Sequence, residues 1–190
     1  MKNNLQTVAA MLRLQARRAG SAEAKEALAE AELRVAAIAV VHESLSSEDG
    51  ERVDFDEIVD RIVALVRDLA PAYSAAETVP ELRRDGSWST LSAELATALA
   101  MVASELLHNA VEHAGARQIT VSLERAPSLL VMRVKDDGRG LPSEFDPGVT
   151  GLGLSIVQSL ITGDLRGTCD FYGTPEGTSV VIKVPNHELT

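Results

Sequence analysis

Cysteine, aromatic residues and positive charge are all scarce in this sequence of 190 residues. Its one cysteine, Cys169, excludes an internal disulfide and favours a reducing compartment, and we expect it to be a small buried side chain of a strand. Aromatic residues make up only 3% of the chain, so aliphatic side chains must fill the core. A net charge of −10 argues against a nucleic acid or an anionic membrane as the main partner.

Long apolar runs are also missing. None reaches the roughly 18 residues that a membrane-spanning helix needs, and the sequence does not open on a signal peptide. We therefore expect a cytoplasmic location. A P-loop lysine, a dinucleotide-binding glycine fingerprint and a cluster of Cys and His metal ligands are absent as well. The hydrophobic fraction of 45% is ordinary for a globular protein of one or two domains.

The N-terminal part of the chain has helical periodicity in two segments. Apolar residues recur at helical spacing over 1–18, and Ser21 is placed to cap a second helix over 22–44. From Val35 to Val41 this second helix is apolar almost all round, which is more surface than one partner helix can cover. Residues 1–46 are therefore predicted to form a helical hairpin that dimerises into a four-helix bundle.

A polar segment around Gly50 reads as a linker to a second domain over 52–190. Helices and strands are mixed there without regular alternation, which predicts an α+β domain with helices on one face of a sheet. The helices are expected at 54–69, where Pro71 would end the first, and at 90–113 and 151–162. The strands are expected at 77–89 (weakly), 119–124, 129–134, 165–172 and 178–184.

Three motifs in this second part contain residue types that suit catalysis or ligand binding. Glu105, Asn109 and His113 lie within about 80° of each other on one face of the 90–113 helix. Alone, such a stripe is most simply a solvated face. However, an Asn amide oxygen is a suitable ligand for Mg²⁺, and a Glu one turn earlier can position or activate a nucleophile.

The second motif is Asp136-x-Gly138-x-Gly140, directly after a predicted strand. A carboxylate there can accept a hydrogen bond from the exocyclic amine of adenine, and the glycines let the backbone approach the ring closely. Asp-Gly is also an ordinary turn dipeptide, so this motif is weak by itself.

The third motif opens an apolar helix and consists of Gly151, Leu152, Gly153 and Leu154. Free backbone N–H groups at such a position would face a phosphate. A Gly177-Thr178 pair then precedes the last predicted strand. Each motif alone is weak, but their order along the chain makes a nucleotide pocket the favoured interpretation.

These motifs resemble the N, G1 and G2 boxes of the GHKL ATPase and kinase superfamily. The segment Lys2–Val8 narrows the resemblance, because it is similar to the sequence just after the phospho-acceptor in histidine kinases whose H box reads His-Arg-Val-Lys-Asn-Asn-Leu-Gln. His42–Leu45 resembles the end of the second helix in the same subfamily. The whole chain thus resembles bacterial sensor histidine kinases of the HisKA_2/HWE-like type.

The resemblance implies a Bergerat-type α/β sandwich that binds ATP and Mg²⁺, a homodimer formed through the hairpin, and phosphotransfer to the receiver domain of a response regulator. It implies that Glu105 is catalytic and that Asn109 holds Mg²⁺. The residues expected to bind ATP are Asn109, His113, Asp136, Gly138, Gly140, Gly151, Leu152, Gly153, Leu154 and Thr178.

The sequence departs from the family in several places. The acceptor histidine would lie just before residue 1, so this chain is expected to lack it and to fail to phosphorylate itself. Met1 stands where the family usually has Val. The loop between Gly140 and Gly151 is short, and Glu112 stands where many histidine kinases have Lys or Arg.

Two other histidines need an interpretation. His42 shares a stripe with Val35 and Ala39, so we expect a packed histidine rather than a substitute acceptor. His108 lies at the edge of the polar stripe, where it is either near ATP or merely solvated.

Two alternative functions remain open. One is a GHKL ATPase or serine kinase of the anti-sigma type, against which the segment Lys2–Gln6 argues. The other is a non-catalytic, ATP-binding dimer scaffold. The expected absence of the acceptor favours the scaffold, whereas the presence of Glu105 and Asn109 argues against it. The stimulus and the cognate response regulator cannot be read from the sequence.

Overall fold

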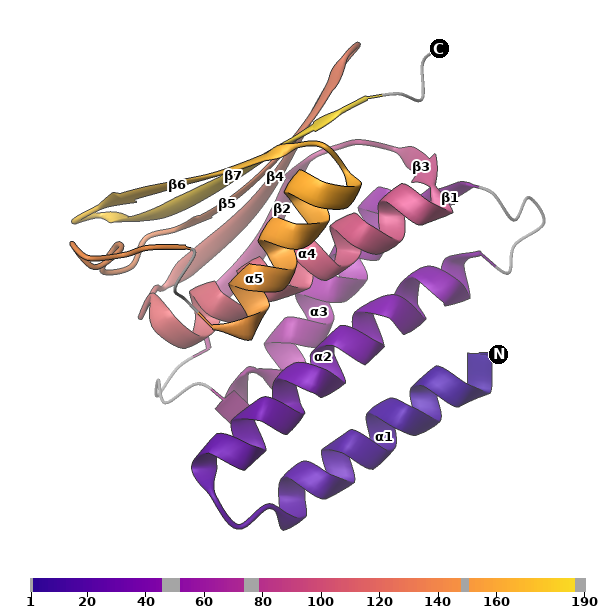
Figure 1. Ribbon diagram of the computed structural model, residues 1–190, viewed down its shortest axis with the longest axis vertical. Coiled ribbons are helices and arrows are strands. Elements are labelled where there is room, and N and C mark those ends of the chain that lie inside the picture. Colours follow the sequence, from indigo (N-terminus) through magenta and orange to yellow (C-terminus); the bar gives the residue numbers. More distant parts are fainter. Residues whose placement is uncertain (1, 46–51, 74–78, 148–150, 187–190) are drawn as a thin grey trace.

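The computed structural model describes residues 2–45, 52–73, 79–147 and 151–186 (Figure 1). The expected linker, the end of the loop before Gly151, and Met1 lie outside these residues. In chain order the elements are α1 (Lys2–Arg18), α2 (Ala22–Ser44), β1 (Arg52–Asp54), α3 (Phe55–Tyr73), β2 (Glu81–Gly86), β3 (Thr90–Ser92), α4 (Ala93–His113), β4 (Gln118–Ala126), β5 (Leu129–Asp136), α5 (Leu152–Gln158), the π-helical segment η1 (Ser159–Asp164), β6 (Thr168–Thr174) and β7 (Gly177–Pro185).

The first two helices form an antiparallel hairpin along one side of the molecule (Figure 1). Ser21 caps α2, because its Oγ accepts a hydrogen bond from the backbone N–H of Ala24 at 3.2 Å. Across the hairpin, Arg13 of α1 donates to Glu32 of α2 at 2.7 Å. Helix α1 is outermost, whereas α2 also packs against α3 and α4.

Five strands form one sheet in the order β2-β4-β5-β7-β6. Strands β2 and β4 are parallel and all other neighbours are antiparallel. Alternate residues of β4 and β5 are buried, because α3, α4 and α5 cover one face of the sheet (Figure 1). Lys135 of β5 pairs with Ser179 of β7, so Asp136 at the end of β5 lies beside Thr178.

A second sheet contains only β1 and β3, three residues each. Trp88, just before β3, is fully buried and stacks on Phe55 with ring centroids 5.2 Å apart. Its indole N–H donates to the carbonyl of Glu124 at 2.9 Å, which ties this small sheet to β4. The sequence analysis did not predict β1 or β3, because three-residue strands are too short to show a period.

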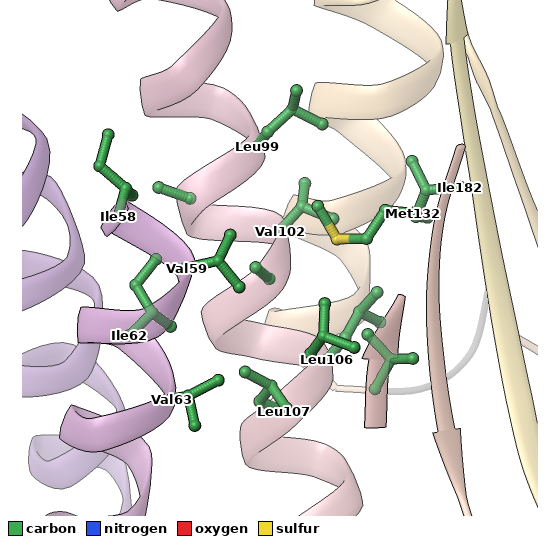
Figure 2. Packing of buried hydrophobic residues seen from close by; sticks show 14 of the residues in the cluster. Ile58, Val59, Ile62, Val63, Leu99, Val102, Leu106, Leu107, Met132 and Ile182 are labelled. Carbon is green, nitrogen blue, oxygen red and sulfur yellow. The ribbon is translucent and has the colours of Figure 1, made fainter. Parts of the chain in front are cut away.

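The hydrophobic core lies on both sides of α4 (Figure 2). Ile58 and Ile62 of α3 face one side of α4, and Met132 and Ile182 of the sheet face the other. The same cluster continues into α2 through Leu33, Val40 and Val41. Since each fully buried side chain of this kind stabilises the fold by about 1.5–3 kcal/mol, this face contributes to the packing of α2 against α3 and α4.

The predicted α+β class and most elements are confirmed, with corrections in detail. Pro71 lies inside the last turn of α3 rather than beyond its end. The weak strand region 77–89 contains β2, and its first two residues are not described. The helix expected at 151–162 is a short α-helix continued by η1.

Part of the all-round apolar segment of α2 is covered within one chain. Ala37 and Val41 have no exposed surface, because α2 packs against α1, α3 and α4 together. Val35, Ala36 and Ile38 of the same segment are only half-buried, so a dimer contact through the hairpin stays a prediction.

Two remaining expectations concern exposure. Cys169 lies in a strand, as predicted, but is half-buried, and burial together with the charge of Asp170 raises the pKa of its thiol to about 12. Within the described ranges, no helix combines the length and the apolar composition that crossing a membrane requires. The cytoplasmic location stays a prediction.

Candidate nucleotide-binding site

A cavity of about 590 Å³ lies between α4, the end of β5, the start of β7 and the start of α5. Its size falls within the roughly 300–1,000 Å³ that is usual for small-molecule sites. Every residue of the predicted site except Gly138 lines it, namely Glu105, Asn109, His113, Asp136, Gly140, Gly151, Leu152, Gly153, Leu154 and Thr178. Residues from four separate parts of the sequence thus meet around one cavity.

Strands β5 and β7 fix the position of Asp136. Its side chain is 5% exposed, and its Oδ1 accepts hydrogen bonds from the backbone N–H groups of Gly138 at 2.9 Å and Thr178 at 3.2 Å. Because both bonds go to Oδ1, Oδ2 is the oxygen that a ligand amine can engage. We call this group, Asp136 with Gly140 and Thr178, the strand side of the cavity.

Gly138 lies behind the cavity rather than in its wall. A Cβ atom there would overlap the backbone carbonyl of Ala114, at the end of α4. The same carbonyl accepts a hydrogen bond from Arg139 at 3.0 Å. Gly138 therefore lets the loop after β5 lie directly against the end of α4, which holds Asp136 next to the cavity.

The opposite wall, which we call the helix side, consists of Glu105 and Asn109 of α4 with the α2 residues that face them. A solvated face is the simplest interpretation of this stripe, but Glu105 is only 2% exposed. Its Oε1 lies 2.6 Å from Nε of Arg34, and its Oε2 lies 3.2 Å from Nη2 of the same guanidinium. Arg34 also donates to Glu30 at 2.9 Å.

Asn109 lies one turn after Glu105. Its side-chain Nδ2 is buried and has no hydrogen-bond partner among the described residues. A buried amide without a partner is costly, so it indicates that a polar ligand completes this position. His113, two turns beyond Glu105, is exposed at the rim.

Helix α2 adds acidic residues that the sequence analysis did not include in the site. Glu26 and Glu30 both line the cavity, next to Glu112 of α4. Burial raises the pKa of Glu112 to about 8, and the hydrogen bond and charge of Glu26 and the charge of Glu30 act in the same direction. The only signal for this arrangement was the i,i+4 spacing of Glu30 and Arg34, which does not reveal what the pair contacts.

The position of His108 differs from both expectations, a place near ATP and a solvated place. The side chain is buried rather than solvated, and it does not line the cavity. Burial lowers the pKa of His108 to about 4, assisted by the charges of His113 and Arg34, so the imidazole is neutral at pH 7. His42 is half-buried in α2, in agreement with a packed residue.

The apolar part of the lining includes two aromatic rings. Phe145 of the loop after β5 and Phe171 of β6 lie with their centroids 5.2 Å apart, and both face the cavity together with Leu141 and Pro142. The short loop therefore supplies more covering side chains than its length suggested. Nothing in the spacing of these residues in the sequence indicates that they line a cavity.

Comparison with known proteins gives a consistent result. Residues 1–70 match the sequence model of the family described as "Histidine kinase", and residues 94–188 match that of the "Histidine kinase-, DNA gyrase B-, and HSP90-like ATPase" family. The sensor histidine kinase PdtaS of Mycolicibacterium smegmatis is 45% identical over 97% of this chain, and PdtaS of Mycobacterium tuberculosis is 43% identical over the same share. The chain spans 38% of the length of these relatives.

Solved structures support the fold. The histidine kinase domain of the blue-light-activated histidine kinase of Erythrobacter litoralis superposes with a TM-score of 0.73 at 21% identity, covering 98% of this chain and 87% of that one. The sheet with helices on one face is thus the Bergerat-type sandwich that the resemblance implied. The HisKA_2-type resemblance is confirmed: the chain belongs to the histidine kinase-, DNA gyrase B- and HSP90-like ATPase family and is similar to sensor histidine kinases of the PdtaS type.

Proposed function

We propose that this chain is the core of a sensor histidine kinase that binds Mg-ATP and promotes transfer of the γ-phosphoryl group to a histidine. A response regulator would then receive the group on an aspartate of its receiver domain. The observation that carries the proposal is the meeting of Asp136, Asn109 and Glu105 around one cavity of suitable size. Within the chain, we propose that residues 1–46 act as the hairpin domain and 52–190 as the ATP-binding domain.

The strand side suits an adenine. Asp136 is held by two backbone N–H groups, so its remaining oxygen has a fixed direction toward a ring amine. Phe145 and Phe171 provide apolar surface for the base. Guanine presents a carbonyl where adenine has an amine, which would oppose two acceptors, so the proposal includes selection of ATP over GTP.

The helix side suits the phosphates and Mg²⁺. Asn109 fits the ion because its amide oxygen is a hard, neutral ligand, and Mg²⁺ needs few protein ligands when phosphates supply the others. Its buried Nδ2, which has no partner among the described residues, is a donor and would face a phosphate oxygen rather than the ion. When bound, Mg²⁺ neutralises charge on the phosphate oxygens. The segment Gly151–Leu154 lines the cavity near Glu105, and we propose that it contacts the phosphates. Glu105 would orient or deprotonate the attacking nucleophile.

The homodimer is proposed to form through α1. Val8, Met11 and Leu14 are 43%, 60% and 50% exposed, and their three-residue spacing places them near one another on α1. The contact would extend the hairpin into a four-helix bundle. Substituting Met11 by Asp should shift the protein from dimer to monomer in sedimentation velocity, while Asp at the exposed Tyr172 of β6 should not.

Titration calorimetry with ATP and GTP, with and without Mg²⁺, tests the nucleotide site directly. Incubation of labelled ATP with this chain and with a longer form that includes the acceptor histidine separates the remaining functions. A histidine kinase labels only the longer form, a scaffold labels neither, and an anti-sigma type kinase labels a serine of another protein. Absence of ATP binding in Mg²⁺ would overturn the proposal.

A further inference from the structure

Helix α2 reaches across to the proposed catalytic residue. Arg34 is 71 positions away from Glu105 in sequence, yet its guanidinium engages both carboxylate oxygens, at 2.6 and 3.2 Å. Both side chains are largely buried, at 13% and 3% exposure. Glu30 binds the same guanidinium at 2.9 Å and fixes its orientation from within α2.

Helix α5 closes the remaining side of Glu105. A Cβ atom at Gly153 would overlap Oε2 of Glu105 and would come within 3.6 Å of Nη2 of Arg34. The glycine therefore lets the start of α5 pack directly on this ion pair. Glu105 is thus enclosed by three helices, and each of its oxygens is engaged by Arg34.

This arrangement does not fit a working base. A general base needs a lone pair within about 2.6–3.2 Å of the proton that it accepts. The bidentate guanidinium already donates to both carboxylate oxygens, so a nucleophile would have to displace it to reach either one. While Arg34 is in place, Glu105 is held away from a nucleophile.

The same helix makes the cavity unfavourable for a triphosphate. Glu26 and Glu30 of α2 line it beside Glu112, so docked α2 adds negative charge where the phosphates are proposed to bind. A ligand shifts a conformational equilibrium only through different affinities for the two states. Mg-ATP would bind better to a state in which α2 has moved away, and moving α2 away would in turn favour Mg-ATP.

We propose that Arg34 is a positioning residue that keeps Glu105 out of the reaction while α2 is docked, and that phosphoryl transfer requires this ion pair to open. The inference rests on the proposed function, since it assumes that Glu105 acts on the nucleophile. It adds a regulatory contact between the hairpin and the nucleotide site.

The test compares Arg34→Gln with Arg34→Lys. Arg34→Gln removes the charge that holds Glu105, and Arg34→Lys keeps a charge but not the bidentate geometry. Arg13→Gln is the matched control, because it breaks a similar contact to the buried Glu32 inside the hairpin, away from Glu105. The readouts are the Mg-ATP dissociation constant and the single-turnover phosphorylation rate at saturating ATP, in a longer form that contains the acceptor histidine.

We expect Arg34→Gln to raise the rate about fivefold or more and to tighten Mg-ATP binding, with Arg34→Lys between it and the unmodified protein. Arg13→Gln should leave both quantities within about twofold. A slower reaction in Arg34→Gln that Arg34→Lys restores would mean that Arg34 assists catalysis, and the inference would be wrong. Equal behaviour of Arg34→Gln and Arg13→Gln would also overturn it. If the unmodified protein binds no ATP, the proposed function fails and this inference fails with it.

Discussion

On the strand side of the cavity, the polar contacts join neighbouring parts of one sheet. On the helix side, they join helices α2 and α4, which lie far apart in the sequence. Asp136 is held by the backbone N–H groups of Gly138, in the loop after β5, and of Thr178, which belongs to the sheet itself. Glu105 is held by Arg34, a side chain of α2 that lies 71 positions away in the sequence. One side is therefore built in advance for a ligand, whereas the state of the other depends on the position of the hairpin.

The largest expected effect is on the helix side. Glu105→Gln should slow phosphorylation of the acceptor histidine about 100-fold or more, because a base acts on the nucleophile in the transition state. ATP affinity should stay near that of the unmodified protein. Single-turnover kinetics and calorimetry on the same longer form measure the two quantities. If Glu105→Gln loses ATP binding as severely as Asp136→Asn, Glu105 belongs to binding and the contrast between the two sides disappears.

The next effect is on the strand side and concerns affinity. Asp136→Asn removes a buried, charge-assisted hydrogen bond worth about 1.5–3 kcal/mol, so it should weaken ATP binding roughly 10- to 150-fold. Calorimetry with ATP measures this, and Asp170→Asn, at a half-buried position of β6 that does not line the cavity, is the matched control. Unchanged ATP affinity in Asp136→Asn, or equal affinity of the unmodified protein for ATP and GTP, would show that the strand side does not bind the adenine.

A smaller effect tests whether Asn109 binds the Mg²⁺ ion. Asn109→Ala should reduce the gain in ATP affinity that Mg²⁺ provides, by roughly tenfold if one ligand to the ion is lost. Binding of ATP without Mg²⁺ should change much less. The comparison of titrations with Mg²⁺ and with a chelator gives the difference. A variant that weakens both titrations equally would show that Asn109 contacts the nucleotide and not the ion.

The smallest effect is a pH dependence of stability on the helix side. The pKa of Glu112 is raised to about 8 in the folded protein, so its protonated form stabilises the fold at low pH and this contribution is lost as pH rises toward 8. The melting temperature should therefore fall by a few degrees between pH 6.5 and 8.5. His108 is neutral in the folded protein over that range because its pKa is lowered to about 4, and it opposes the slope only near pH 6.5, where the unfolded histidine loses its proton.

Glu112→Gln provides the check on this pH dependence. The variant should melt at nearly the same temperature at both pH values, because Gln has no proton to lose where Glu26 and Glu30 face it. If the variant keeps the slope of the unmodified protein, the titrating group lies elsewhere. A slope of opposite sign in the unmodified protein would contradict the arrangement of the three carboxylates.

The sequence predicted the strand side better than the helix side for a physical reason. Asp136, Gly140 and Thr178 are placed by the motifs themselves, since strand ends and glycine turns are set by nearby residues. The surroundings of Glu105 depend on which helix docks against α4, and the spacing of Arg34 along α2 does not encode its partner. The periodicity also predicted most helices and strands, but not the three-residue strands β1 and β3.

The extent of the predicted dimer surface on α2 could not be read from the sequence for a related reason. An all-round apolar helix indicates that several neighbours cover it, but the pattern does not say whether they come from the same chain. Here α3 and α4 supply the cover for Ala37 and Val41. Phe145 and Phe171 of the cavity were missed because an isolated aromatic residue has no pattern that distinguishes a ligand contact from a core position.

The single tryptophan gives the molecule an internal optical probe at one known place. Trp88 is stacked on Phe55 and bonded to the carbonyl of Glu124, so its emission changes when the junction of α3 and β4 opens. Circular dichroism at helical wavelengths follows α1 and α2 as well. Because Leu33, Val40 and Val41 of α2 belong to the same core as α3, the two signals together show whether hairpin and sheet lose their structure in one cooperative transition or in two.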